Sequence, residues 1–89
     1  MKRTVTKIID GDTFIVNRHI GSTNKVRLAD VDAPERGSWQ GSQATNTLKR
    51  LLGDGSVSII PVGRSYDRVV ADVRHDRRSV NKAMRQRGY

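Results

Sequence analysis

Carboxylates gather in one part of the chain. Five of the nine acidic residues lie within positions 10–35, namely Asp10, Asp12, Asp30, Asp32 and Glu35. The chain as a whole is strongly basic, with 17 lysines and arginines. A basic protein that concentrates its carboxylates in one region can hold a cation there. Carboxylate oxygens are the ligands that the hard cations Ca²⁺ and Mg²⁺ prefer. This region is therefore the candidate chemical site.

Asp12 and Asp32 are the carboxylates that the expected strands bring together. Asp10-Gly11 is a tight-turn signal, so Asp12 stands at the start of a returning strand. Asp32 follows an apolar strand, residues 25–31, that a proline stops. In a three-stranded meander both positions fall at the same end of the sheet. The pair would repel when alone and would coordinate a cation, with a carbonyl and waters completing its shell. The alternative is that Asp10 and Asp12 simply favour a turn.

Two arginines are candidates for binding a phosphate. Arg27 and Arg68 lie on different expected strands that can contribute to one face of a barrel. Each guanidinium donates two parallel hydrogen bonds and keeps its charge at any working pH. The alternative for either residue is a solvated charge or a counterion for a nearby aspartate.

Three further side chains lie in loops or near turns. Glu35 follows a rigid proline and is placed to act as a general base for a water that attacks phosphorus, or else to pair with Arg36. Tyr66 can hydrogen-bond a phosphate, stack on a base or fill the mouth of a barrel. We expect Trp39, the single tryptophan, to cover the base of a helix rather than to stack on a base.

Composition limits the class of protein. Eighty-nine residues make one small domain, and the net charge of +8 favours a polyanionic partner, nucleic acid first. Without cysteine there is neither a disulfide nor a thiolate metal site. No apolar run is long enough to span a membrane, and the N-terminus lacks the apolar core of a signal peptide. We expect an intracellular protein or a processed secreted fragment, with no membrane partner.

The pattern of apolar residues predicts five strands and two helices. The spacing of Ala44, Leu48 and Leu51 predicts a helix that begins at Ser42 and ends at Gly53, and Ser79 caps a second, short helix. The expected strands are residues 2–9, 12–17, 25–31, 56–62 and 68–74. This order fits a mainly β (α+β) fold, a five-stranded Greek-key barrel of the OB type with one helix between strands three and four and one after strand five. An open α+β sheet is the alternative.

Four stretches of the chain resemble the staphylococcal nuclease (thermonuclease) family in order and spacing. They span nearly the whole chain: residues 10–13, 27–35, 66–68 and 80–88. The first two stretches together are highly specific. The resemblance implies an OB-type barrel, over residues 1–89, that hydrolyses DNA and RNA with calcium.

The resemblance also implies roles for individual residues. Asp12 and Asp32 would be calcium ligands. The position of a metal-contacting threonine is occupied by Ala33, whose backbone carbonyl can still serve. Glu35 would be the general base.

Arg27 and Arg68 would bind the phosphate and stabilise a pentacoordinate transition state. Besides Ala33, two further departures accompany this resemblance. Asp67 replaces a glycine and puts a negative charge beside the phosphate clamp, and the chain ends where family members continue into a further segment and a third helix. We therefore expect a domain of marginal stability.

Together these features predict a metal-dependent phosphodiesterase that hydrolyses DNA or RNA, with Ca²⁺ as cofactor and Mg²⁺ as a substitute. The expected partner is nucleic acid, and we expect a monomer. The alternative is a nucleic-acid-binding OB module without chemistry. The sequence does not distinguish DNA from RNA.

Overall fold

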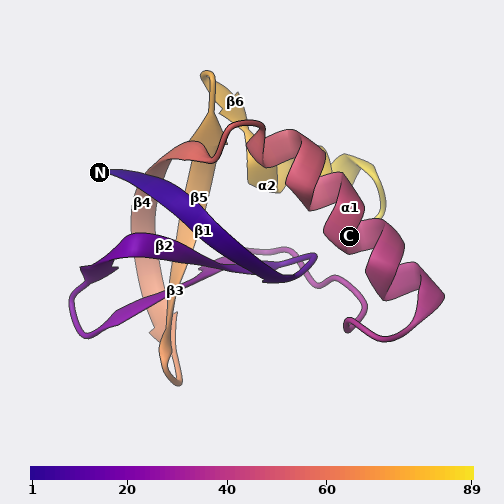
Figure 1. Cartoon of the computed structure of the whole chain (residues 1–89), viewed down its shortest axis with the longest axis horizontal. Helices are drawn as coiled ribbons and strands as arrows, with labels where there is room; N and C mark the ends of the chain where they lie inside the picture. Colours follow the sequence, from indigo (N-terminus) through magenta and orange to yellow (C-terminus); the bar gives the residue numbers. More distant parts are fainter.

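The computed structural model describes residues 1–89 as a small barrel with both helices on one side of it (Figure 1). The elements in chain order are β1 (Lys2–Asp10), β2 (Thr13–Ile20), β3 (Thr23–Leu28), α1 (Trp39–Leu52), β4 (Ser56–Ser65), β5 (Arg68–His75), β6 (Arg78–Ser79) and α2 (Val80–Gln86). The five strands and two helices expected from the sequence are all present, and β6 is a two-residue addition.

One sheet closes on itself to make the barrel. The strand order is β3-β2-β1-β4-β5-β6, and β3 also pairs in parallel with β5. That second pairing joins Val26 to Val69 and Leu28 to Ala71, so β3 and β5 complete the ring. The expected five-stranded OB-type barrel with a helix after strand three and another after strand five is confirmed. Neither helix has the length and apolar character needed to cross a lipid bilayer.

The core fills the barrel and the space beneath α1. On β5 the buried residues alternate with more exposed ones, as a strand with one buried face requires. From α1, Leu48 and Leu52 pack into the same cluster, and Ala44 is buried beside them, as the helical spacing predicted. Burying one such leucine contributes about 1.5–3 kcal/mol. The core therefore fixes α1 against the barrel and, with it, the loop that precedes the helix.

The first helix begins one turn earlier than the sequence predicted. Its N-cap is Ser38, whose Oγ accepts a hydrogen bond from the backbone N–H of Gly41, and not Ser42. The apolar spacing starts only at Ala44, so it carries no information about a polar first turn. Trp39, the first residue of α1, is 72% exposed, so the expectation that it covers the helix base is wrong.

The third strand ends at Leu28, three residues before the predicted end at Val31. Asp30 has a left-handed backbone (φ 57°), which turns the chain out of the sheet. Ala29 and Val31 stay buried, so the apolar run reflects burial against the rest of the barrel rather than strand pairing. As a result Asp32 lies on a loop that folds back towards Arg27.

Two strands extend three residues beyond their predicted ends, and β1 and β5 extend one residue beyond theirs. β2 continues to Ile20 and β4 to Ser65. The added residues of β2 end in a pairing with β3, and those of β4 pair with β5, while their polar side chains face solvent. Pro61 lies beyond the pairing of β4 with β1, where the missing N–H breaks no hydrogen bond with β1, and a bulge follows it. The turn between β4 and β5 is thereby reduced to Tyr66 and Asp67.

The second helix is fixed to the barrel by one buried side chain. Asn81 is 1% exposed, and its Oδ1 accepts a hydrogen bond from the N–H of Val73 at 2.9 Å. Its Nδ2 donates to the carbonyls of Ala29 at 2.9 Å and Ala71 at 3.0 Å. Ser79 caps α2, as predicted, with its Oγ accepting from the N–H of Lys82. Asn81 thus joins α2 and β5 to the segment that leads into Asp32.

Candidate active site

Asp12 is the buried anchor of the site. It lies in the β1–β2 turn, one residue before β2 begins, and is only 6% exposed. Its Oδ1 accepts a hydrogen bond from the Thr13 hydroxyl at 2.8 Å, and its Oδ2 accepts one from the N–H of Ala33 at 3.1 Å. An ionised carboxylate has about four acceptor positions, so two remain available to a further partner.

Glycine is required at position 11 because the turn has no space for a side chain there. Its φ is not in the left-handed region, contrary to the conformation that a tight Asp-Gly turn favours. A side chain at this position would collide with the Cβ atoms of Ala33 and Ala44. The turn that carries Asp12 is therefore pressed against both α1 and the loop before it.

Asp10 closes the turn through a hydrogen bond, and its own pKa is shifted by its surroundings. Its Oδ1 accepts a hydrogen bond from the N–H of Asp12 at 3.1 Å, closing the turn. Partial burial, together with the neighbouring Asp12 carboxylate, raises the pKa of Asp10 above its ordinary value. The turn thus concentrates negative charge at one end of the barrel.

Arg27 stands between the two predicted metal ligands. Its Nη1 donates to the carbonyls of Val31 at 2.6 Å and Leu28 at 3.1 Å, which fixes the plane of the guanidinium. Its Nη2 lies 3.6 Å from Oδ2 of Asp12 and 3.5 Å from Oδ1 of Asp32. The two carboxylates therefore flank a single nitrogen atom, and the expected approach of the two aspartates is present.

Asp32 contrasts with Asp12 in its surroundings. Its side chain is 94% exposed, whereas that of Asp12 is 8% exposed. The backbone N–H of Asp32 donates to the carbonyl of Tyr89 at 3.0 Å, which holds the loop in place. One carboxylate is thus rigid and buried and the other faces solvent, where a ligand from solution can reach it.

The donor set fits a hard cation that keeps most of its water. Asp12 and Asp32 converge, but nowhere does the structure bring three carboxylate or histidine side chains together as a ready-made metal cluster. Ala33 reaches Asp12 through its N–H, which is a donor, so its predicted role as a carbonyl ligand stays a prediction. Two carboxylates with water completing the shell is an arrangement that Ca²⁺ and Mg²⁺ accept.

Arg68 faces the same side of the barrel as Arg27. Arg27 pairs with Val70 across β3 and β5, and Arg68 lies two residues before Val70 on β5. Residues two apart on a strand share a face, so both guanidiniums are directed outward from neighbouring strands. The side chain of Arg68 makes no hydrogen bond or ion pair within the protein, which leaves all its donors for a ligand.

Tyr66 lies at the tip of the β4–β5 turn. It is 92% exposed and has a left-handed backbone (φ 59°). Its ring does not fill the mouth of the barrel, which was one of the predicted alternatives. The phenol and the face of the ring are instead open to a ligand that reaches Arg68.

The negative charge of Asp67, next to Arg68, is paired with a lysine. Its carboxylate accepts a hydrogen bond from Nζ of Lys25 at 2.9 Å, and this bond lowers the pKa of Asp67. Its backbone carbonyl accepts a hydrogen bond from the hydroxyl of Thr23, which pins the turn to β3. The departure from glycine at this position is thus compensated by a lysine on a neighbouring strand.

Glu35 lies on the loop that joins β3 to α1. Its side chain is exposed and forms no ion pair, and Arg36 donates instead to the carbonyl of Ile8, so the predicted Glu35–Arg36 pair is absent. The backbone of Glu35 is fixed, because its carbonyl accepts from the Ser38 hydroxyl and packs against Gly41, where any side chain would clash.

Two open depressions adjoin this constellation. One, of about 420 Å³, is lined by Arg27, Asp32 and Ser65 among others. The second, of about 560 Å³, includes Asp10 and Glu35. Arg27 and the candidate base Glu35 thus line separate hollows, and Arg68 lines neither of them.

Comparison with known proteins shows the family of the chain. A family model described as "Staphylococcal nuclease homologue" matches residues 25–89 of the chain. The chain belongs to the staphylococcal nuclease family. Members of this family are generally metal dependent.

Two curated relatives of this family member carry nuclease names. One is an "Uncharacterized endonuclease" of Haemophilus influenzae, 34% identical over 85 residues, which are 94% of this chain and 48% of that protein. The other is a "Micrococcal nuclease" of Shigella flexneri, 51% identical over 49 residues, which are 53% of this chain and 26% of that protein. The chain thus spans about half or less of the length of these relatives.

Sequence reasoning missed three residues that position the site of this staphylococcal nuclease homologue. Lys25 neutralises Asp67, Gly41 admits the Glu35 carbonyl, and Asn81 holds the segment before Asp32. A glycine inside a helix is a signal of close approach that the sequence does offer. The partners of Lys25 and Asn81 are distant in sequence and could not be read from local pattern.

Proposed function

We propose that the chain is a metal-dependent phosphodiesterase that hydrolyses DNA or RNA. The observation that carries this proposal is the placement of Arg27, fixed by two carbonyls and flanked by Asp12 and Asp32. A guanidinium held against two carboxylates is arranged to receive a phosphate on one side and a cation on the other. The nuclease names of the relatives support the same class of reaction.

The residues of the chain take separate parts in the proposed reaction. Arg27 and Arg68 bind the phosphate oxygens and neutralise charge that develops as water attacks phosphorus in line. Glu35 accepts the proton of the attacking water, while the new P–O bond forms and the bond to the leaving oxygen breaks. Tyr66, exposed beside Arg68, binds the nucleotide.

A cation completes the proposed site. Asp12 and Asp32 would hold it, with the carbonyl of Ala33 as an additional candidate ligand. When bound, a divalent cation polarises the phosphoryl oxygen and lowers the pKa of water. Calcium is the proposed metal, because one exposed and one buried carboxylate make a flexible, hydrated site.

A second candidate function is a nucleic-acid-binding OB module without catalysis. The observation that favours it is that only two carboxylates converge and no third joins them. In this case the same arginines and Tyr66 would bind nucleic acid, and Glu35 would have no role.

Glu35→Gln distinguishes the two functions, because it keeps the size of the side chain and removes the base. Turnover should fall about 10²–10⁴-fold, the usual range for a positioned acid or base. Affinity for a single-stranded oligonucleotide, measured by fluorescence anisotropy in chelator, should not fall, since one negative charge is lost. Cleavage by Glu35→Gln at the parent rate would remove Glu35 from the mechanism, and absence of cleavage by the parent in every metal would favour the binding module.

A further inference from the structure

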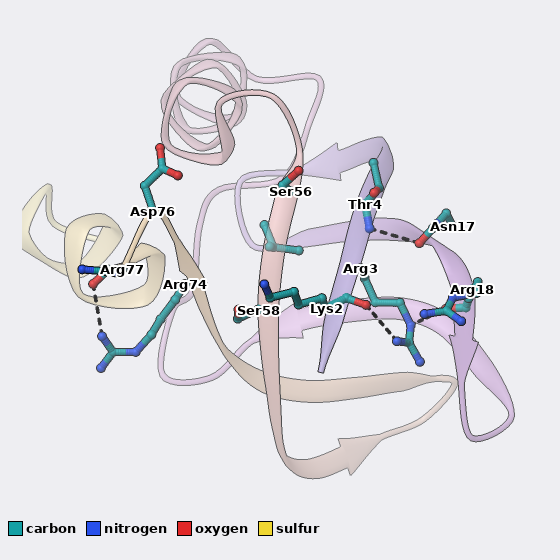
Figure 2. Close-up of a pocket in the computed structure, with 11 residues that line it drawn as sticks. Lys2, Arg3, Thr4, Asn17, Arg18, Ser56, Ser58, Arg74, Asp76 and Arg77 are labelled. Carbon is teal, nitrogen blue, oxygen red and sulfur yellow. Dashed lines mark hydrogen bonds between the residues drawn. The ribbon is translucent and has the colours of Figure 1, made fainter.

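A basic groove lies outside the candidate active site. It has a volume of about 710 Å³, larger than either depression beside Arg27 and Glu35. Its side chains come from the start of β1, the far part of β2, the start of β4, the end of β5 and the turn that follows β5 (Figure 2). The cations that line it are Lys2, Arg3, Arg18, Arg74 and Arg77, and the one carboxylate is Asp76.

None of these five cations is neutralised by a carboxylate. The ion pairs of the structure involve only Lys25, Arg27 and His75 as cationic partners. Asp76, the single acidic residue of the groove, is directed to Nε2 of His75 at 3.3 Å. Clustered like charges without counterions repel one another. A polyanion that binds in the groove relieves this repulsion and so lowers the free energy.

The positive charges are spread along the groove rather than gathered at a point. Figure 2 shows Arg74 and Arg77 on one side of Lys2. Arg3 and Arg18 lie on its other side. Arg3 is held in place, with its guanidinium donating to the carbonyls of Lys2, Arg18 and His19. This spacing suits a linear chain of phosphates better than a single phosphate group.

Polar side chains fill the space between the cations. Thr4, Asn17, Ser56 and Ser58 line the groove, and Val57 is its single apolar residue. The N–H of Thr4 donates to Oδ1 of Asn17 at 3.0 Å, which leaves the Nδ2 group of Asn17 as a donor (Figure 2). No aromatic residue is available to stack on a base. The chemistry therefore fits the sugar–phosphate backbone and offers no reading of base identity.

The groove lies at the far end of the strands that carry the candidate site. Arg68 begins β5, and Arg74 lies six residues further on, which is roughly 20 Å at about 3.3 Å per residue. A short nucleotide bound at Arg27 and Arg68 would not reach the groove. A longer strand that leaves the site along the barrel could.

We propose that this groove binds the phosphodiester backbone of the nucleic-acid substrate outside the site of cleavage, an inference that rests on the proposed function for the identity of the ligand. Binding there adds affinity for long strands and adds nothing to the chemical step. The probe is single-stranded oligothymidylate of about 20 nucleotides, longer than the roughly 4–16 that one OB fold covers, compared with one of about 4.

The groove variant is Lys2→Gln, Arg18→Gln, Arg77→Gln, since these three side chains make no hydrogen bond or ion pair within the protein. The matched control is Lys49→Gln, Arg50→Gln, Lys82→Gln, which removes the same charge from exposed positions on α1 and α2. The control side chains are likewise unbonded. Binding is measured in excess chelator by fluorescence anisotropy as a function of salt concentration.

The groove variant should bind the long strand about tenfold or more weakly than the parent. Its slope of log affinity against log salt should fall by about 2, since each phosphate contact on single strands contributes about 0.7. The control should bind close to the parent, and the short strand should bind both variants alike. If groove and control variants lose the same affinity for the long strand, the effect is general electrostatics and the proposal is overturned.

The assay separates this inference from the proposed function. Binding in chelator does not depend on cleavage, so a protein that is inactive in every metal and still shows the groove effect would retain the inference and lose the nuclease. Conversely, cleavage with a groove variant that matches its control would retain the nuclease and overturn the inference. With an active protein, the groove variant should raise KM for the long strand and leave kcat unchanged.

Discussion

Asn81→Ala is expected to destabilise the barrel more than any exposed substitution. The asparagine makes three buried hydrogen bonds, one to β5 through the N–H of Val73 and two to carbonyls of Ala29 and Ala71. The carbonyl of Ala71 also accepts from the N–H of Ala29, so it keeps a partner in the variant. The N–H of Val73 loses its acceptor while it stays buried.

The magnitude follows from these contacts. A buried donor left without an acceptor costs about 1–3 kcal/mol, and each lost Nδ2 bond contributes about 1 kcal/mol. The sum is about 3–5 kcal/mol in the free energy of unfolding. For a domain of this size each kcal/mol is worth about 4–8 °C, so Tm should fall by about 12–40 °C.

Urea unfolding followed by circular dichroism measures this loss. The control is Asn46→Ala, an exposed position in the middle of α1 where alanine is the better helix former. The control should leave the stability unchanged or slightly higher. Because Asn81 holds the segment before Asp32, hydrogen exchange of the Asp32 amide should also accelerate in Asn81→Ala. A loss below about 1 kcal/mol would refute the hydrogen-bond reasoning.

Three other changes have expected outcomes. Calcium should raise Tm by about 10–20 °C at a hundredfold excess over Kd, since ligand binding then adds about 2.7 kcal/mol, and Asp32→Asn should abolish that rise in a thermal melt. Gly41→Ala should lower the cleavage rate and Tm, and in free-energy terms the effect on the rate should be the larger, because a Cβ there displaces the Glu35 carbonyl. Equal kinetics for the variant and the parent would contradict this. Lys25→Met should lower Tm at neutral pH, and the difference from the parent should vanish as pH falls well below 3.8. The sign follows because the Lys25 bond lowers the pKa of Asp67, so its stabilisation is present above the unfolded value and is lost on protonation.

Local pattern was sufficient for the order of the strands and helices and for the pairing of the two aspartates. The turn signal before Asp12 and the apolar run before Asp32 place both at one end of a meander, and the structure brings both to Arg27. The same apolar run misled the prediction of where the third strand ends, because Ala29 and Val31 are buried outside the sheet. Periodicity reports burial, and it does not distinguish a strand from a packed loop.

Contacts that depend on closure of the barrel could not be predicted. Lys25 meets Asp67 across 42 positions, and Asn81 meets Ala29 across 52. Both contacts exist because β5 lies beside β3 in parallel, a pairing for which no turn signal exists in the sequence. The open α+β sheet that remained as an alternative would have separated these residues.

Cleavage of plasmid and single-stranded DNA in calcium, in magnesium and in excess chelator is the decisive measurement for a metal-dependent nuclease. We expect cleavage in calcium at least equal to that in magnesium, none in chelator, and little by Asp32→Asn in either metal. Asp32 is suited to this test because its side chain is 94% exposed and its loss should not unfold the barrel. Full cleavage in chelator, or an Asp32→Asn variant as active as the parent, would contradict a cation held by Asp12 and Asp32.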